Sequence, residues 1–237
     1  MNLIKESWTQ EDINNFRNYL ISFSKGKEKG EWEKRIINTN LTCIAVPSQE
    51  TRKIIKEISK GNFIDFINFW PWNNYTESII VGNLICCIKD FKTFEKFLKK
   101  YATKVDNWAN CDSLKFKINN KNKDKFFKLA LELVKEEKPF VKRIGLVILL
   151  KLLNFKEFLN DIFKVLNSFK TEEYYYVNMM LAWLFSECFV KYKEETLQFL
   201  KTHNLNKFVI NKGISKCRDS FRVSKQDKDF LLSYKVK

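Results

Sequence analysis

Residues that interrupt regular secondary structure are scarce in this chain. Its 237 residues include only six glycines and three prolines, about 4% of the chain against an average of about 12%. A β-sandwich or β-barrel needs turn residues at intervals of about 8–12 positions. Collagen-like chains and flexible linkers are still richer in glycine or proline. The sequence therefore predicts an ordered protein built almost entirely of helices.

Apolar residues recur three and four positions apart along almost the whole chain, as in amphipathic helices. In the first segment Thr9 and Asp12 form a capping box in front of an apolar series that ends at Phe23. Pro139 lies where a helix accepts proline, in its first turn. After a charged, glycine-containing break at 25–30, further helices are expected over 31–37, 49–59, 63–70, 76–88, 91–101, 105–116, 124–135, 139–153, 155–169, 172–192, 194–202 and 205–218, with a last one from Ser224.

The links between these segments are short, which favours antiparallel hairpins stacked on their neighbours. Hairpins of roughly 35–40 residues approach the period of HEAT-like repeats, and about six of them fit the chain. We therefore predict an all-α fold, an α-solenoid of HEAT-like hairpins with a concave basic face. A globular helical bundle is the competing fold. No strong linker divides the chain, so residues 1–237 are expected to form a single helical-repeat domain, with divergent N-terminal helices in residues 1–40.

The chain is strongly basic, with 43 Lys and Arg against 28 Asp and Glu and a formal net charge of +15. Such an excess indicates a polyanionic partner, either nucleic acid or an anionic membrane surface. The abundance of Lys, Asn and Ile could also reflect codon bias. However, residues 201–237 carry ten basic residues against three aspartates, so the charge is concentrated at one end. The charge alone does not decide between nucleic acid and a membrane surface.

Several classes of site and location are excluded or disfavoured by composition. His203 is the only histidine, which excludes His-based catalytic triads and most His-rich metal sites. The six cysteines form no CxxC pair. The longest uncharged stretches have 14 residues (36–49) and 13 residues (174–186), whereas a membrane span needs about 20. We expect a cytoplasmic monomer.

Trp108 and Asp112 are four residues apart, so on a helix they share one face. An indole beside a carboxylate can bind a cation through both the ring quadrupole and the charge. The structural alternative is that Trp108 belongs to the core and Asp112 is a solvated or capping residue. This spacing alone does not decide between the two.

Two later residues strengthen the functional interpretation. Arg143 follows Asp112 by 31 positions and Trp183 follows Arg143 by 40, so repeating hairpins would place them similarly on successive repeats. Arg143, next to Lys142, lies in an apolar helix where an unpaired guanidinium would be costly. It needs an anionic partner, either a protein carboxylate or a phosphate.

A basic series near the C-terminus has the character of a phosphate-binding face. Lys212 and Lys216 recur at helical spacing, and Arg218 and Arg222 follow. Contacts of this kind position a duplex without reading its sequence. The alternative is an ordinary solvated helix face.

Three motifs resemble the DNA alkylation repair family of the AlkD type, helical-repeat DNA glycosylases that remove alkylated purines. They are DNWANCDSL at 106–114, YYVNMMLAW at 175–183, and NKGISKCR at 211–218 followed by RVS at 222–224. The resemblance runs from about residue 44 to residue 237 and looks closer to a divergent subgroup. It implies that Asp112 is the catalytic carboxylate, that Trp108 and Trp183 are aromatic residues of the cleft, and that Arg143 contacts a phosphate.

The activity that the resemblance implies is hydrolysis of the N-glycosidic bond of cationic N3- or N7-alkylated purines. The resemblance also implies double-stranded DNA as the partner, association with the nucleoid when the protein is bound to DNA, and no requirement for a metal or a cofactor. A carboxylate stabilises the oxocarbenium-like charge that develops on the sugar and can orient water. The first alternative is a DNA-binding protein of the same fold that recognises DNA shape or damage without excising the base. The second is a helical-repeat scaffold that binds an acidic protein.

Overall fold

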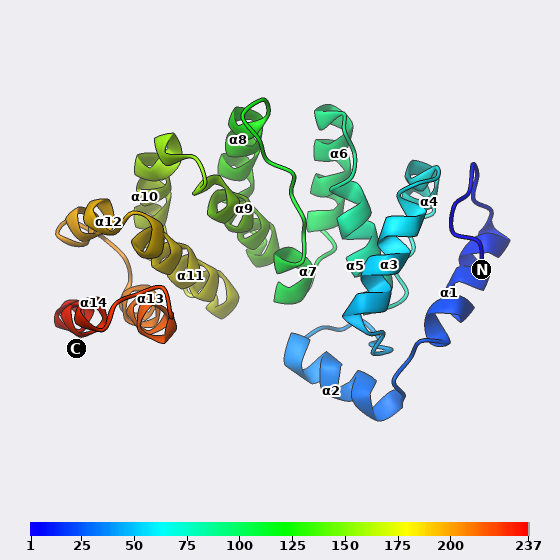
Figure 1. Ribbon diagram of the computed structural model, residues 1–237, viewed down its shortest axis with the longest axis horizontal. Coiled ribbons are helices and arrows are strands. Elements are labelled where there is room, and N and C mark those ends of the chain that lie inside the picture. Colours follow the sequence, from blue (N-terminus) through cyan, green and yellow to red (C-terminus); the bar gives the residue numbers. More distant parts are fainter. Residues whose placement is uncertain (237) are drawn as a thin grey trace. The chain divides into compact units, whose positions relative to one another are not determined.

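The computed structural model describes residues 1–236 and is built of helices (Figure 1). Within those residues no strand forms, and the only β-type pairing is an isolated parallel bridge between Thr42 and Asn74. The all-α prediction is confirmed. The α-helices are α1 (Gln10–Ile21), α2 (Lys27–Ile37), α3 (Ser48–Ile58), α4 (Phe63–Asn68), α5 (Tyr75–Ile85), α6 (Phe91–Ala102), α7 (Trp108–Asp112), α8 (Lys123–Leu133), α9 (Pro139–Leu152), α10 (Leu159–Ser168), α11 (Tyr175–Lys191), α12 (Lys193–Leu200), α13 (Lys207–Asp219) and α14 (Lys225–Phe230).

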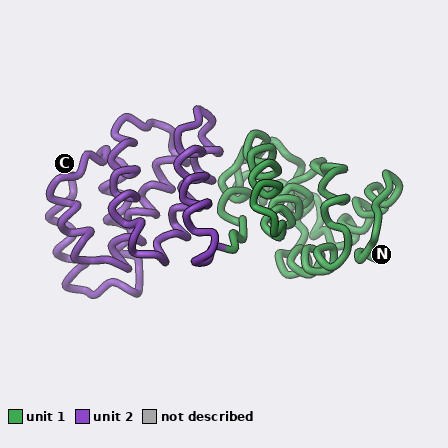
Figure 2. Tube along the Cα trace, turned by 90° about the horizontal axis from the view of Figure 1, so that it is seen from above, with its two compact units in different colours: residues 1–117 green, residues 118–237 purple. Residues whose placement is uncertain are grey.

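The helices divide into two compact units, Met1–Lys117 with α1 to α7 and Ile118–Lys237 with α8 to α14 (Figure 2). Each unit has its own buried apolar core. The prediction that the chain forms a single helical-repeat domain stays a prediction.

The second unit is a stack of helical hairpins. Helices α9, α11 and α13 pack side by side, while α8 packs on α9, α10 and α12 on α11, and α14 on α13. A glycine allows α11 and α13 to approach each other closely. A Cβ on Gly213 of α13 would lie 2.4 Å from Cδ1 of Phe185 on α11. This repeated pairing of neighbouring helices is the packing typical of α-solenoids.

The first unit is organised around α5, which contacts α3, α4, α6 and α7. Nine of the eleven residues of α5 are buried, so it forms the centre of the core. Glu77 on this helix is fully buried; it accepts hydrogen bonds from Arg17 Nε (3.1 Å) and the Asn73 backbone N–H (2.6 Å). Burial raises the pKa of Glu77, and Arg17 opposes that rise. This ion pair ties α1 to α5.

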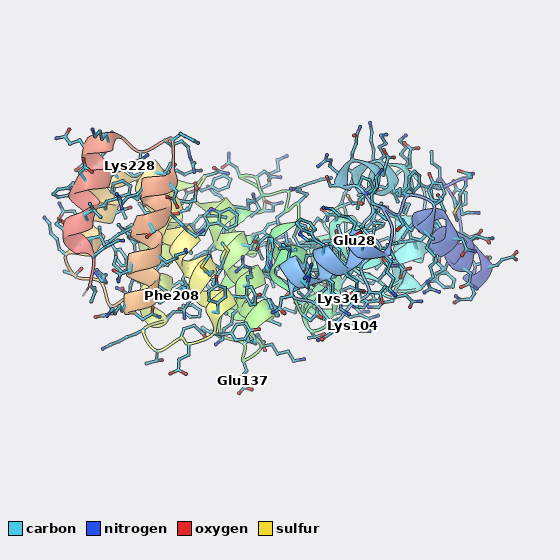
Figure 3. The ribbon with its side chains drawn as sticks, turned by 90° about the horizontal axis from the view of Figure 1, so that it is seen from below. Glu28, Lys34, Lys104, Glu137, Phe208 and Lys228 are labelled. Carbon is cyan, nitrogen blue, oxygen red and sulfur yellow. The ribbon has the colours of Figure 1, made fainter. Side chains whose placement is uncertain are left out.

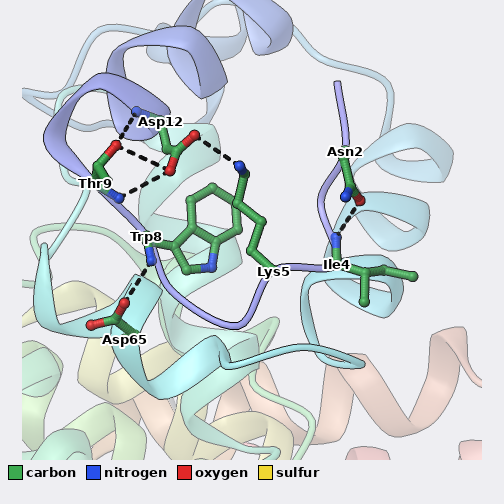
Figure 4. A network of polar contacts seen from close by, with 7 residues as sticks. All are labelled: Asn2, Ile4, Lys5, Trp8, Thr9, Asp12 and Asp65. Carbon is green, nitrogen blue, oxygen red and sulfur yellow. Dashed lines mark hydrogen bonds and ion pairs between the residues drawn. The ribbon is translucent and has the colours of Figure 1, made fainter.

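The capping box predicted at the first helix is present (Figure 4). The Thr9 hydroxyl accepts from the Asp12 backbone N–H at 3.1 Å, and the Asp12 carboxylate accepts from the Thr9 backbone N–H at 3.0 Å. Lys5 adds an ion pair to Asp12 at 2.9 Å. The backbone N–H of Trp8 donates to Asp65 at the start of α4 (2.6 Å), so the helix entrance is anchored to the rest of the unit.

All fourteen expected helical segments are found, but two differ clearly from their predicted bounds. The predicted break at 25–30 is wrong from residue 27 onward, because α2 begins at Lys27 and Gly30 lies inside it. A Cβ on Gly30 would lie 2.2 Å from the Cys43 carbonyl oxygen, so this glycine serves close packing. The helix predicted over 105–116 is reduced to the five residues of α7. The Asn107 side chain caps its first turn, so the helix begins at Trp108.

Candidate functional site

Helix α7 carries two of the predicted catalytic residues, Trp108 at its first position and Asp112 at its last. Both side chains are half-buried. Because they lie four residues apart, they project from the same side of the helix. The structure therefore brings Trp108 and Asp112 together on one short, partly exposed element.

A buried amide network holds α7 in place. The side-chain oxygen Oδ1 of Asn107 accepts from the Asn110 backbone N–H at 2.9 Å, and Nδ2 of Asn107 donates to Asn110 Oδ1 at 2.6 Å. Asn110, which is fully buried, also donates to Ser78 Oγ on α5 and to the Tyr101 hydroxyl on α6, both at 2.8 Å. A five-residue helix has little intrinsic stability, so these bonds fix its position.

The C-terminal end of α2 is fastened to the same helix. Trp108 Nε1 donates to the Ile36 carbonyl oxygen at 3.3 Å. Asp106, just before α7, accepts from the Thr39 hydroxyl and from the Asn40 backbone N–H, each at 2.7 Å. The indole N–H is thus used within the protein, while the half-exposed ring remains beside Asp112. Neither Asp106 nor the contact with α2 was identified from the sequence.

In the second unit, the predicted phosphate ligands Lys142 and Arg143 lie at the start of α9 and already have protein partners. Arg143 is 5% exposed, and its Nη1 donates to the Tyr176 carbonyl oxygen on α11. Lys142 forms an ion pair with Glu172 at 2.9 Å. Burial raises the pKa of Glu172, but hydrogen bonds from Lys142 and the Tyr174 backbone outweigh it, and the pKa lies below its usual value.

A cavity of about 300 Å³ between α11 and α13 brings three more predicted residues together. Trp183, Lys216 and Arg222 line it, together with Glu187. Arg222 holds the Glu187 carboxylate with both terminal nitrogens, one contact being 3.0 Å. Glu187 was missed from the sequence, although it follows Trp183 at the same four-residue spacing by which Asp112 follows Trp108.

The remaining basic residues of α13 divide between two sides of the helix. Lys212 is exposed and lines a shallow hollow with Phe208, Lys207 and Lys235; Phe208 is labelled in Figure 3. Lys216 is one turn further along the same side. Arg218 is also exposed. Because it lies two residues beyond Lys216, its side chain projects about 200° around the helix axis from that of Lys216. Lys212 and Lys216 therefore form one basic face, which Arg218 does not join.

Among residues 1–236, no group of three or more His, Cys, Asp or Glu side chains is arranged to hold a metal ion. In the same part of the chain no helix has the length and apolar character required to cross a membrane.

The comparison with protein families gives a match over most of the chain. The model of the family described as DNA alkylation repair enzyme matches residues 17–217. The chain belongs to this family. The matched region extends further toward the N-terminus than the sequence resemblance did, and it includes α2. It contains every predicted site residue except Arg218 and Arg222. No curated protein and no solved structure matches the chain.

Membership of the family implies that DNA is the partner. If Arg222 contacts a phosphate of the DNA, its ion pair with Glu187 should weaken that contact. Because the carboxylate both neutralises Arg222 and repels phosphate, we expect Glu187→Gln to bind duplex DNA more tightly than wild type. The slope of log affinity against log salt should steepen by up to about one unit, as one more cation becomes available. Fluorescence anisotropy at several salt concentrations measures both quantities. Glu194→Gln, a change of the same charge on α12, is the control; equal effects of the two variants would contradict a specific role of Arg222.

Proposed function

We propose that this member of the DNA alkylation repair family is an alkylpurine DNA glycosylase, which hydrolyses the N-glycosidic bond of purines alkylated at N3 or N7. The observation that carries the proposal is the pairing of Trp108 and Asp112 on a helix that a buried network immobilises. Electrostatic catalysis requires such fixed groups, because a charge that must reorganise stabilises the transition state less.

The proposed reaction depends on the positive charge of the lesion. An N3- or N7-alkylated purine leaves as a neutral base when the C1′–N bond breaks and its electron pair goes to the purine. The sugar then carries oxocarbenium-like positive charge. Asp112 stabilises this charge and accepts a proton from the water that adds to C1′. The products are an abasic site and the free alkylated base, and the proton passes from Asp112 to solvent.

Trp108 is proposed to contribute its ring face to this cation. Trp183, in the second unit, is proposed as an aromatic residue that contacts the DNA. The half-buried position of each ring supports these roles, since a fully buried ring could not reach a substrate. The residues proposed as phosphate ligands are Lys142, Arg143, Lys212, Lys216, Arg218 and Arg222. Among these, Lys212 and Arg218 are exposed, whereas Lys142 and Arg222 would have to exchange a carboxylate partner for phosphate.

The direct test is release of bases from methylated duplex DNA, separated and quantified by HPLC. We expect 3-methyladenine or 7-methylguanine to appear faster than by spontaneous depurination. If the protein binds the duplex but releases neither base, the alternative takes its place: a DNA-binding protein of the family that does not excise. The exposed basic residues of α13 support that alternative independently of Asp112.

Replacing Lys212 and Lys216 by Ala should weaken binding to all duplexes alike, because phosphate contacts carry no sequence information. The salt slope should flatten by about one to two units, one for each lost contact. The control is the double variant Lys128→Ala/Lys201→Ala, which removes the same charge from exposed positions on α8 and after α12. An equal loss in both double variants would show that only net charge matters and that α13 is an ordinary solvated helix.

A further inference from the structure

The first unit contains a cavity of about 390 Å³ that the proposed reaction does not use. It lies among α2, α3, α5 and the segment after α7. Its size falls within the range of about 300–1,000 Å³ usual for small-ligand pockets. Ser113, which immediately follows Asp112 in the sequence, is one of the lining residues.

A carboxylate that forms no ion pair faces this cavity. Glu33 on α2 accepts a hydrogen bond from the Ala45 backbone N–H at 3.2 Å and forms no ion pair within residues 1–236. Burial raises the pKa of Glu33; the Ala45 N–H and the more distant charge of Lys29 oppose this rise without cancelling it. The nearest lysine on its own helix, Lys29, has its ammonium over the Trp32 ring at 3.7 Å. A half-buried carboxylate held in this way favours a ligand that brings N–H donors or positive charge.

The other walls suit a flat heterocycle. Tyr75 lies close to Glu33: burial and then the Glu33 charge raise the pKa of its phenol well above the usual value. Ile55 and Ile79 provide apolar surface on α3 and α5. An aromatic ring, apolar side chains and one acceptor are the elements by which proteins hold a nucleobase.

Two cations at the rim complete the arrangement. Arg52 on α3 and Lys115 after α7 both line the cavity, and both are exposed. Within residues 1–236, neither side chain forms an ion pair. A guanidinium and an ammonium beside an apolar pocket are suited to a phosphate group. They also argue against a purely cationic ligand, because it would be repelled at the entrance.

We propose that this cavity binds a nucleotide, with the base beside Glu33 and Tyr75 and the phosphate on Arg52 and Lys115. Since Glu33 is an acceptor, bases with amino groups are preferred, and an N7-alkylated guanine is held more tightly than guanine. The preference for an alkylated base rests on the proposed function. The nucleotide is either one rotated out of duplex DNA or a free mononucleotide, and the chemistry of recognition is the same.

The test is calorimetric titration of the full-length protein with 7-methylguanosine 5′-monophosphate and with GMP. We expect saturable binding of both, with the methylated nucleotide favoured by about tenfold through its charge. Glu33→Gln should abolish that preference, and Arg52→Ala should weaken both ligands by about tenfold. Arg35→Ala removes the same charge from an exposed position on α2 outside the cavity and should change neither affinity.

A second set of measurements starts from the wild-type protein. Inorganic phosphate should compete with GMP on the wild-type protein. For the DNA source, 2-aminopurine in a duplex should gain fluorescence on binding wild type, and the cavity-filling Ile55→Trp should prevent the gain. A gain identifies a nucleotide of the duplex; mononucleotide binding without it identifies the free nucleotide.

No saturable binding of either mononucleotide, or equal losses in Arg52→Ala and Arg35→Ala, would overturn the proposal. These outcomes are separable from failure of the proposed function. A protein that excises no base can still bind the mononucleotides, and a protein without this nucleotide site can still excise through Asp112.

Discussion

Asp112→Asn should retain the fold and the DNA affinity of the protein but lose most of its base excision. Asn is nearly the same size as Asp and still forms hydrogen bonds, so the packing around α7 should change little. The negative charge that stabilises the sugar cation is lost, however. Removal of one well-placed electrostatic stabiliser costs about 10²–10³ in rate, and the largest part of the excision activity should disappear with it.

Single-turnover release of a methylated purine, normalised to folded protein, measures this effect. Asp124→Asn is the matched control, because Asp124 is an exposed aspartate in the first turn of α8. A purely structural Asp112 makes a different forecast: the variant would lose about 1 kcal/mol of unfolding free energy, and excision per folded molecule would be unchanged. That result would remove Asp112 from the proposed mechanism.

Asn110→Ala should reduce both the stability of the first unit and the activity of the site. The side chain of Asn110 is fully buried and bonds to Ser78, Tyr101 and Asn107. Each buried polar group left without a partner costs about 1–3 kcal/mol, so we expect a loss of about 3 kcal/mol in the free energy of unfolding. Excision should also fall at temperatures where the variant is folded, since α7 has lost the bonds that position it.

Urea unfolding followed by circular dichroism measures the loss of stability. Asn204→Ala is the control: Asn204 is exposed, and its side chain takes part in no hydrogen bond among residues 1–236. It should change the free energy of unfolding by less than about 0.5 kcal/mol. If the two variants are equally stable, the buried network contributes little, and the position of α7 must be set by apolar packing instead.

The sequence alone determined the fold class and the location of the helices. Scarce glycine and proline, together with apolar residues at helical spacing, predicted all fourteen helical segments, because these signals are local. The spacing also placed Trp108 with Asp112, since residues four apart meet on any helix. The family resemblance pointed to the same residues, and the match over residues 17–217 confirms the family.

Only the tertiary structure decided what surrounds those residues. The contact of Trp108 with Ile36 and the ion pair of Arg222 with Glu187 join residues 72 and 35 positions apart. The sequence predicted that Gly30 belongs to a break between helices. In the structure it lies within α2, and a glycine is required there because the Cys43 carbonyl oxygen leaves no room for a Cβ. The cavity beside Glu33 likewise combines four segments. Contacts of this kind depend on how helices approach one another, and local periodicity contains no information about the side chains that a distant segment will bring.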